Sequence, residues 1–375
     1  MKGSPTRKRP AATITRQPTG EFVELDGEPF YRIGDHDKMP PFFLSVVSAE
    51  DHWMFLSSHG GLTAGRGDAD HALFPYDTDD KIRDNTETTG GKTVIRVRRA
   101  GGDALWEPFS IRGEGRFRVR RSLLKSVWGN EVWFEEANED LGLVFRTGWS
   151  NSRRFGWIRR SSLANTGRQR VSAVFLDGIQ NIMPSGIGSD FQMRYSTLLD
   201  AYKRSERLPG SRLALFRLSA VPADRPEPAE SLEATTVWSV SPVKADAILL
   251  SATQLDALRR GETLRPENDV CGRRGAYFLH GRRNLAPGQA AEWMFGADVS
   301  QSAADVVRLG AALEKSSAFR REVLTDIREG TEELKRIVGS SDGLQVSARP
   351  MGSARHYTNT LCNVMRGGVF AHGEK

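Results

Sequence analysis

The amino-acid sequence predicts a mainly β fold in which large antiparallel sheets pack face to face. From about residue 20 to 300, short runs of Val, Ile, Phe, Trp and Thr are broken by Gly, Asp and Asn, as in strands joined by turns. Several runs alternate polar and apolar residues, so one face of each strand is buried and the other is wet. Eight tryptophans and 18 phenylalanines supply large side chains for the core between two sheets.

Residues 21–300 are expected to form this β domain. Two stretches within it have helical spacing of apolar residues, 191–203 and 251–260, and the first has Ser189 or Asp190 as a candidate N-cap. A loop rich in Pro and Glu separates later strands. The strands that the pattern predicts most directly are residues 92–98, 115–120, 131–135, 143–146, 171–176 and 212–218.

After residue 300 the pattern changes to amphipathic helices. Residues 302–314 and 319–337 each place apolar side chains on one helical face, so a helical linker is expected over 301–340. Residues 341–375 are typical of the beginning of another domain. We therefore expect the chain to be the front part of a larger protein, with an exposed apolar patch on the linker helices and on residues 361–370 that favours association. A homodimer is a further expected assembly.

Composition narrows the possible partners. The net charge is only +6, from 53 basic and 47 acidic residues, and the first 20 residues, expected to be a disordered basic tail, carry part of it. The arginines at 116–121, 153–154 and 159–160 alternate with apolar residues, as on exposed strand faces, and form no concentrated basic stripe, which argues against a nucleic-acid partner. No apolar run is long enough for a membrane helix. The basic residues 1–10 have no apolar region after them, so we do not expect them to be a secretory signal. Two cysteines far apart in sequence favour the reducing cytoplasm.

Four segments carry a resemblance to a known family. Residues 41–66 (PFFLSVVSAEDHWMFLSSHGGLTAGR), residues 72–80 (ALFPYDTDD), residues 176–184 (LDGIQNIMP) and residues 344–370 resemble parts of glycoside phosphorylases of the cellobiose phosphorylase type. The resemblance extends over about residues 25–370. It implies a large antiparallel β-supersandwich, a helical linker, and the stub of a missing (α/α)6 barrel at 341–375.

The resemblance also implies a function. In that family the general acid and most of the phosphate site lie on the barrel, so no catalytic residue is expected here, and the chain would contribute to oligosaccharide binding and to assembly. A separately encoded helical-barrel polypeptide would be a partner. No cofactor is expected, although inorganic phosphate would be a co-substrate if the intact protein is a phosphorylase. The alternatives are a stand-alone carbohydrate-binding or scaffold module, and an intact hydrolase whose acid lies among residues 77–80.

One segment offers candidate sugar-binding residues. Sugars stack on aromatic rings, His and Arg donate to hydroxyl groups, and two glycines, Gly60 and Gly61, allow a tight loop. The alternative is a plain hairpin with a core tryptophan. The acidic residues 77–80 and 135–136 are interpreted as surface charge. No metal site is expected, because the four histidines between residues 36 and 71 have neither helical i, i+4 spacing nor a cysteine partner. The candidates are Trp53, His59, Arg66 and Asp68.

Overall fold

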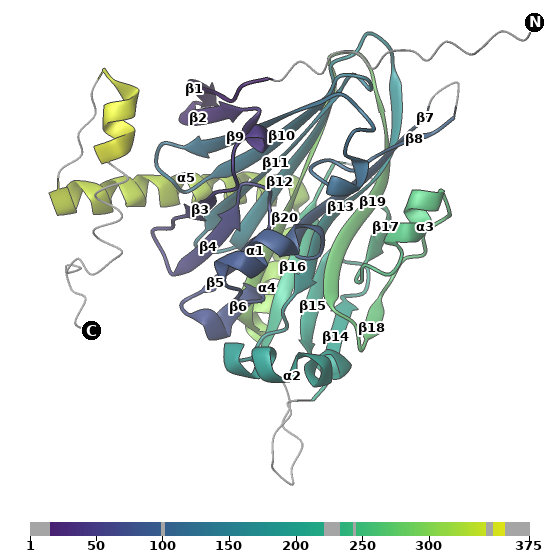
Figure 1. The fold of residues 1–375 in the computed structure, drawn as a ribbon. Helices are drawn as coiled ribbons and strands as arrows, with labels where there is room; N and C mark the ends of the chain where they lie inside the picture. The colour runs from purple at the N-terminus through teal and green to yellow at the C-terminus, as the bar shows by residue number, and fades with distance from the viewer. Residues whose placement is uncertain (1–15, 99–101, 221–232, 243–244, 343–347, 357–375) are drawn as a thin grey trace, which may run out of the picture.

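The computed structural model describes residues 16–98, 102–220, 233–242, 245–342 and 348–356. Over these residues the chain forms antiparallel sheets of eleven, five and four strands, with helices after and between them (Figure 1). The predicted mainly β architecture is confirmed. Among these residues no helix combines the length and the apolar character needed to cross a membrane.

The eleven-stranded sheet draws strands from nearly the whole chain. Each strand pairs antiparallel with its neighbours, which is the pattern that the alternating sequence predicts. In spatial order its strands are β1 (Thr19–Leu25), β2 (Glu28–Gly34), β9 (Val119–Ser126), β10 (Val132–Asn138), β11 (Leu143–Ser152), β12 (Gly156–Asn165), β20 (Ala290–Ser302), β16 (Glu233–Val240), β15 (Leu213–Leu218), β14 (Lys203–Arg207) and β18 (Asp269–Cys271).

Two smaller sheets complete the β structure. The five-stranded sheet has the order β17 (Ala245–Leu249), β19 (Gly275–Leu285), β13 (Val171–Ile182), β7 (Gly90–Arg98) and β8 (Ala104–Trp106). The four-stranded sheet has the order β3 (Phe43–Val46), β4 (His52–Ser57), β5 (Leu62–Arg66) and β6 (Ala72–Phe74).

The helices are α1 (Asp79–Asp84), α2 (Ser189–Tyr202), α3 (Leu255–Arg260), α4 (Ala303–Leu313) and α5 (Ser316–Asp342), and residues 350–356 are also helical. Short 3-10 turns are η1 (His36–Lys38), η2 (Ala69–His71), η3 (Asn85–Glu87) and η4 (Ile111–Gly113). A capping box at Ser302, closed with Asp305, begins α4 directly after β20.

Most predicted elements form where the pattern places them, and the misses have local causes. Residues 115–120 are largely a turn, because Gly115 takes a positive φ of 71° and the strand begins only at Val119. The N-cap of α2 is Gly188, not Ser189 or Asp190. The helix expected at 251–260 begins only at Leu255 and ends against the left-handed Gly261.

The main core lies between the eleven-stranded and five-stranded sheets. Trp157 and Trp293 of the large sheet meet Phe175 and Ile179 of β13, and all four side chains are at most 2% exposed. The rings of Phe175 and Trp293 stack with centroids 4.5 Å apart. Burying large aromatic side chains stabilises the fold by about 2–3 kcal/mol each, which makes this layer the main source of cohesion.

Helix α5 covers the outer face of the large sheet. Its apolar residues Phe319, Val323 and Ile327 are buried against Phe155 and Trp238. The Phe319 ring meets the rings of Phe155 and Trp238 edge to face, at 5.0 and 4.9 Å. The exposed apolar patch expected on the linker helices is therefore wrong for α5, because the sheet already buries that face. The part of the expected barrel stub at 357–375 lies outside the described residues.

A buried ion pair joins the two large sheets. Arg159 on β12 is 1% exposed and Asp177 on β13 is fully buried, and two hydrogen bonds of 3.0 and 2.8 Å connect them. Asp177 also accepts hydrogen bonds from Thr93 at 2.6 Å and from the indole N–H of Trp293 at 2.6 Å. The interpretation of Arg159 as a surface residue is wrong, because its strand turns this side chain toward the core.

Removing one member of this pair is expected to be costly. Asp177→Ala leaves the guanidinium of Arg159 charged in the core, so the free energy of unfolding should fall by about 3–5 kcal/mol. The matched control is Asp269→Ala, which breaks the exposed two-bond pair with Arg204 and should cost about 1 kcal/mol or less. Urea unfolding measures both. Equal losses of unfolding free energy in the two variants would show that the buried ion pair contributes no more to stability than the exposed one.

Candidate functional site

The structure brings three of the four candidate residues together. Trp53 on β4 lies opposite Gly65 on β5, and its indole Nε1 donates to the backbone oxygen of Asp68 at 3.1 Å. Arg66 is the last residue of β5 and lies between Gly65 and Asp68 in the sequence. His59 lies in the turn at the other end of the β4–β5 hairpin. The four candidates therefore do not form one site.

Trp53 belongs to an exposed aromatic cluster on the outer face of the four-stranded sheet. Phe55, two residues along the same strand, and Tyr76, just after β6, are each 44% exposed. The ring of Trp53 is 6.3 Å from that of Phe55, nearly parallel at 29°, and 5.6 Å from that of Tyr76, edge to face. Trp53 itself is only partly buried, so it is not a core side chain. We call these three residues the aromatic platform.

The platform is held in place from below. The indole of Trp53 lies over Gly65, where an added Cβ atom would come within 2.5 Å of the ring. The absence of a side chain at Gly65 therefore leaves room for the ring. The hydrogen bond to Asp68 fixes the orientation of the Trp53 ring. Alternation along β4 sends Met54 and Leu56 inward to the core and leaves Trp53 and Phe55 facing outward. A rigid ring loses little entropy when a ligand packs on it.

Arg66 and Asp68 are already engaged by the protein. Arg66 forms ion pairs with Asp51 at 2.8 Å and with Asp298 at 3.1 Å. Asp68 accepts hydrogen bonds from the ring nitrogen of His71 at 2.7 Å and from the backbone N–H of Asp70 at 3.0 Å. The hydrogen bond from His71 lowers the pKa of Asp68 below its usual value. These contacts give both residues a structural role beside Trp53.

Behind Arg66 lies a buried polar group that the sequence does not reveal. Burial raises the pKa of Asp298 to about 6, although Arg66 and the backbone N–H of Val299 act in the opposite direction. Burial, and then the charge of Arg66, lowers the pKa of His52 to about 3. Asp298 borders a cavity of about 290 Å³ beside α4. Alternation alone would not find these residues, because their environment depends on strands far apart in sequence.

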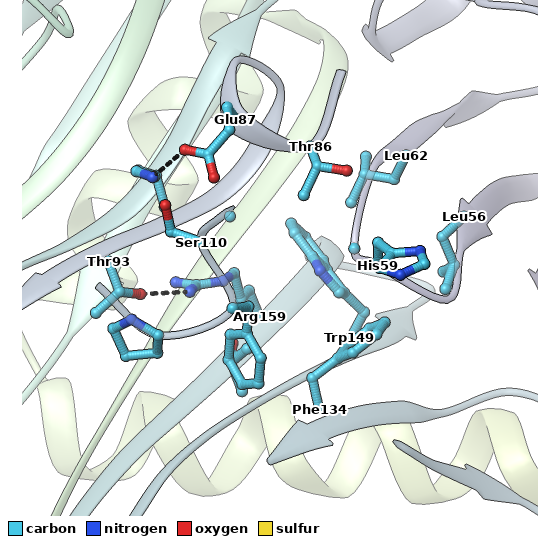
Figure 2. Close-up of a pocket in the computed structure, with 16 residues that line it drawn as sticks. Leu56, His59, Leu62, Thr86, Glu87, Thr93, Ser110, Phe134, Trp149 and Arg159 are labelled. Atoms are coloured by element: carbon cyan, nitrogen blue, oxygen red, sulfur yellow. Dashed lines mark hydrogen bonds and ion pairs between the residues drawn. The ribbon is translucent and has the colours of Figure 1, made fainter. Parts of the chain in front are cut away.

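His59 borders a small cavity near the buried ion pair. Figure 2 shows this cavity, with Glu87 and Arg159 on one side and Trp149 and His59 on the other. Lys92, also at its wall, pairs with Glu87 at 2.5 Å and with Glu107 at 3.1 Å. The cavity volume is about 50 Å³. That volume suits a few water molecules and is far below the roughly 300–1,000 Å³ of ligand pockets, so a sugar ring does not fit.

The acidic residues interpreted from the sequence as surface charge include one that is buried, Glu136, and one that is exposed, Asp80. Glu136 is 1% exposed and accepts hydrogen bonds from the indole of Trp106, the backbone N–H of Phe109 and the side chain of Arg121, so the surface interpretation is wrong for it. Asp80 is exposed, and a hydrogen bond from Thr78 lowers its pKa. A general acid needs the opposite shift, so Asp80 is poorly suited to that role.

The chain matches no protein-family model, and no curated protein is similar enough in sequence to count as a match. Among solved structures it is similar to a polysaccharide lyase, at 11% identity over 76% of this chain with a TM-score of 0.37. It is similar to a bacterial glucoamylase in complex with acarbose, at 8% identity over 84% with a TM-score of 0.44. It is also similar to a protein from the human microbiome described as a kojibiose phosphorylase, at 7% identity over 72% with a TM-score of 0.32.

The chain spans 34%, 41% and 28% of the lengths of these three proteins. By name, all three are carbohydrate-active enzymes, and none is a cellobiose phosphorylase. At TM-scores below 0.5 these similarities do not decide what this chain does.

The buried carboxyl group of Asp298 predicts a pH dependence of stability. Its folded-state pKa of about 6 lies above the ordinary value of 3.8, so the folded state binds this proton more tightly than the unfolded state does. The resulting stabilisation is complete below about pH 4 and is lost as the pH rises through about 6. We expect the free energy of unfolding of the wild type, measured relative to Asp298→Asn, to fall across this window. The measurement is urea unfolding at a series of pH values.

His52 does not confound this comparison. Its lowered pKa gives a contribution of the opposite direction, which weakens as the pH falls below 6.5, but both proteins carry it. A difference between wild type and Asp298→Asn that stays constant from about pH 4 to pH 7 would contradict the expected titration of Asp298.

Proposed function

We propose that this chain is a carbohydrate-binding β-supersandwich and that oligosaccharide packs on the aromatic platform. The observation that carries the proposal is the exposure of Trp53, Phe55 and Tyr76 on one rigid sheet face. Exposed apolar clusters of this kind mark ligand-binding surfaces, and the C–H face of a pyranose ring is apolar while its hydroxyl edge is polar. Aromatic rings suit such a ligand because they supply a large apolar area with few rotatable bonds.

The platform continues across the sheet, which favours an extended ligand. Phe43 on β3 is 38% exposed and lies diagonal to Phe55 on the same face. The guanidinium of Arg83 on α1 lies 5.8 Å from the centre of the Phe43 ring. Aromatic surface and a nearby cation thus run from Trp53 toward α1. An oligosaccharide of several units would use this strip better than a monosaccharide.

We propose further that the chain is the non-catalytic part of an enzyme of the glycoside phosphorylase type. Asp80, with its lowered pKa, is poorly suited to be the catalytic acid. In this proposal the acid lies on a separately encoded helical-barrel polypeptide, and inorganic phosphate is the co-substrate. A homodimer belongs to the same proposal. A stand-alone binding module in the cytoplasm is the alternative.

The raised pKa of Asp298 favours a second candidate, an intact hydrolase. A carboxyl group with a pKa of about 6 beside a cavity is what a general acid requires. Its oxygens, however, already accept from Arg66, from the backbone N–H of Val299 and from the side chain of Gln301. We therefore rank this candidate second.

Truncating the platform should weaken sugar binding. We expect Trp53→Ala to reduce affinity for a neutral hexasaccharide about tenfold or more, because the central ring of the platform is lost. Isothermal titration calorimetry against cellohexaose and maltohexaose measures this. The control is Tyr195→Ala, which removes a 51% exposed ring on α2 that is not one of the three platform residues. If Trp53→Ala folds and binds as the wild type does, the platform is not the site.

Turnover distinguishes the two catalytic candidates. The chain alone should neither release nor consume phosphate with β-linked disaccharides and glucose 1-phosphate, nor hydrolyse the disaccharides. Adding a barrel polypeptide encoded next to it should produce activity. Hydrolysis by the chain alone, abolished in Asp298→Asn, would establish the hydrolase and refute the non-catalytic role.

A further inference from the structure

An open groove lies between α5 and the outer face of the eleven-stranded sheet. Its volume is about 520 Å³, within the roughly 300–1,000 Å³ range of ligand pockets. One wall is the stretch of α5 around residues 320–328, and the other comes from β1, β2, β10, β11, β12 and β20. It lies on a different sheet from the aromatic platform, which stands on β4.

Five arginines line the groove, and not all of them are matched by carboxylates. Arg160 pairs with Asp26 at 3.1 Å and with Glu131 at 2.6 Å. Arg320 pairs with Glu292 at 3.1 Å, and Arg146 pairs with Glu135 at 2.5 Å. Within the described residues Arg321 and Arg328 meet no carboxylate. The contact recorded for Arg328 is the hydroxyl of Thr325, at 3.3 Å.

Arg321 and Arg328 are held in a fixed relation to one another. They are seven residues apart on α5, so they share one face, about 10 Å apart along the helix axis. The helix cannot rotate freely, because Val323 and Ile327 between them are buried in the core beneath. Both guanidinium groups are therefore presented along the same wall of the groove.

The floor of the groove is also fixed. The indole of Trp133 lies between Gly148, where a Cβ atom would come within 2.2 Å of the ring, and the guanidinium of Arg160, 4.5 Å from the ring centre. Ser162 and Thr325 add hydroxyl groups at the two walls. The lining thus has five arginines against four carboxylates, Asp26, Glu28, Glu131 and Glu292, and is positive by one charge. It also has hydroxyl groups that can exchange hydrogen bonds with a sugar.

We propose that this groove binds an acidic oligosaccharide whose anionic groups pair with Arg321 and Arg328. The planar guanidinium fork matches a carboxylate or sulfate group with two parallel hydrogen bonds. The spacing of the two arginines suits a chain that carries repeated charges. The sugar identity of the ligand rests on the proposed function, whereas the anionic character and the location rest on the groove itself.

The experiment is calorimetric titration of the 375-residue chain with trigalacturonate, its fully methyl-esterified form and a triglutamate peptide. We expect trigalacturonate to bind, and the ester, which has the same size without charge, to bind about tenfold more weakly or not at all. Arg321→Ala/Arg328→Ala should weaken trigalacturonate binding about tenfold. The control, Arg336→Ala, removes another exposed arginine of α5 that pairs with Glu333, and should bind as the wild type does.

The possible results test anion binding in the groove independently of sugar binding on the aromatic platform. Loss of trigalacturonate binding in the double arginine variant but not in Trp53→Ala supports the groove, even if neutral hexasaccharides fail to bind the platform. Equal binding by the double variant and Arg336→Ala overturns it. Tighter binding of triglutamate than of trigalacturonate also overturns it, in favour of an acidic peptide. Competition between a sulfated chondroitin disaccharide and trigalacturonate would support the proposal, because it would show that the groove recognises the anionic groups that both ligands carry.

Discussion

The ion pair between Arg159 and Asp177 is the constraint on which the sandwich depends. Two opposite charges in a buried layer are tolerable only when each lies against the other with good geometry. Here Thr93 and Trp293 complete the shell of Asp177. Because the partners lie on β12 and β13, in different sheets, the pair favours a single alignment of those sheets. Apolar packing alone would specify this alignment less strongly.

Strand β12, which carries Arg159 of the buried pair, also contributes to the floor of the groove beside α5. Arg159 points into the core, and its neighbour Arg160 points outward over Trp133, at the floor of the groove. Strand β4 divides in the same way, with Met54 inward and Trp53 and Phe55 outward. Since large side chains and one ion pair fill the interior, the cavity beside Arg159 has room for little more than water. Ligand-sized space is left on the outside of the sheets.

Sequence periodicity predicted the strands well because alternation is a local property. It could also have found Phe55, which shares a face with Trp53 by its i, i+2 spacing. It could not find Tyr76, whose place beside Trp53 depends on how β6 pairs with β5. Nor could it separate Arg159 from Arg160, or recognise Glu136 as buried, because a buried charge is defined by partners distant in sequence. The linker helices were predicted by their amphipathic pattern, but the sheet face that buries them was not.

The docking of α5 connects the packing of the fold to the groove. A helix that buries Phe319, Val323 and Ile327 against a sheet must place its flanking residues at the edge of that contact. Arginines are suited to such an edge because their stems pack on apolar surface while their charged ends reach solvent. An acidic oligosaccharide that pairs with Arg321 and Arg328 on the helix and contacts Ser162 on the sheet would link the two walls of the groove. Ligand binding and helix docking would then stabilise one another, since a ligand that binds only the folded arrangement raises its stability.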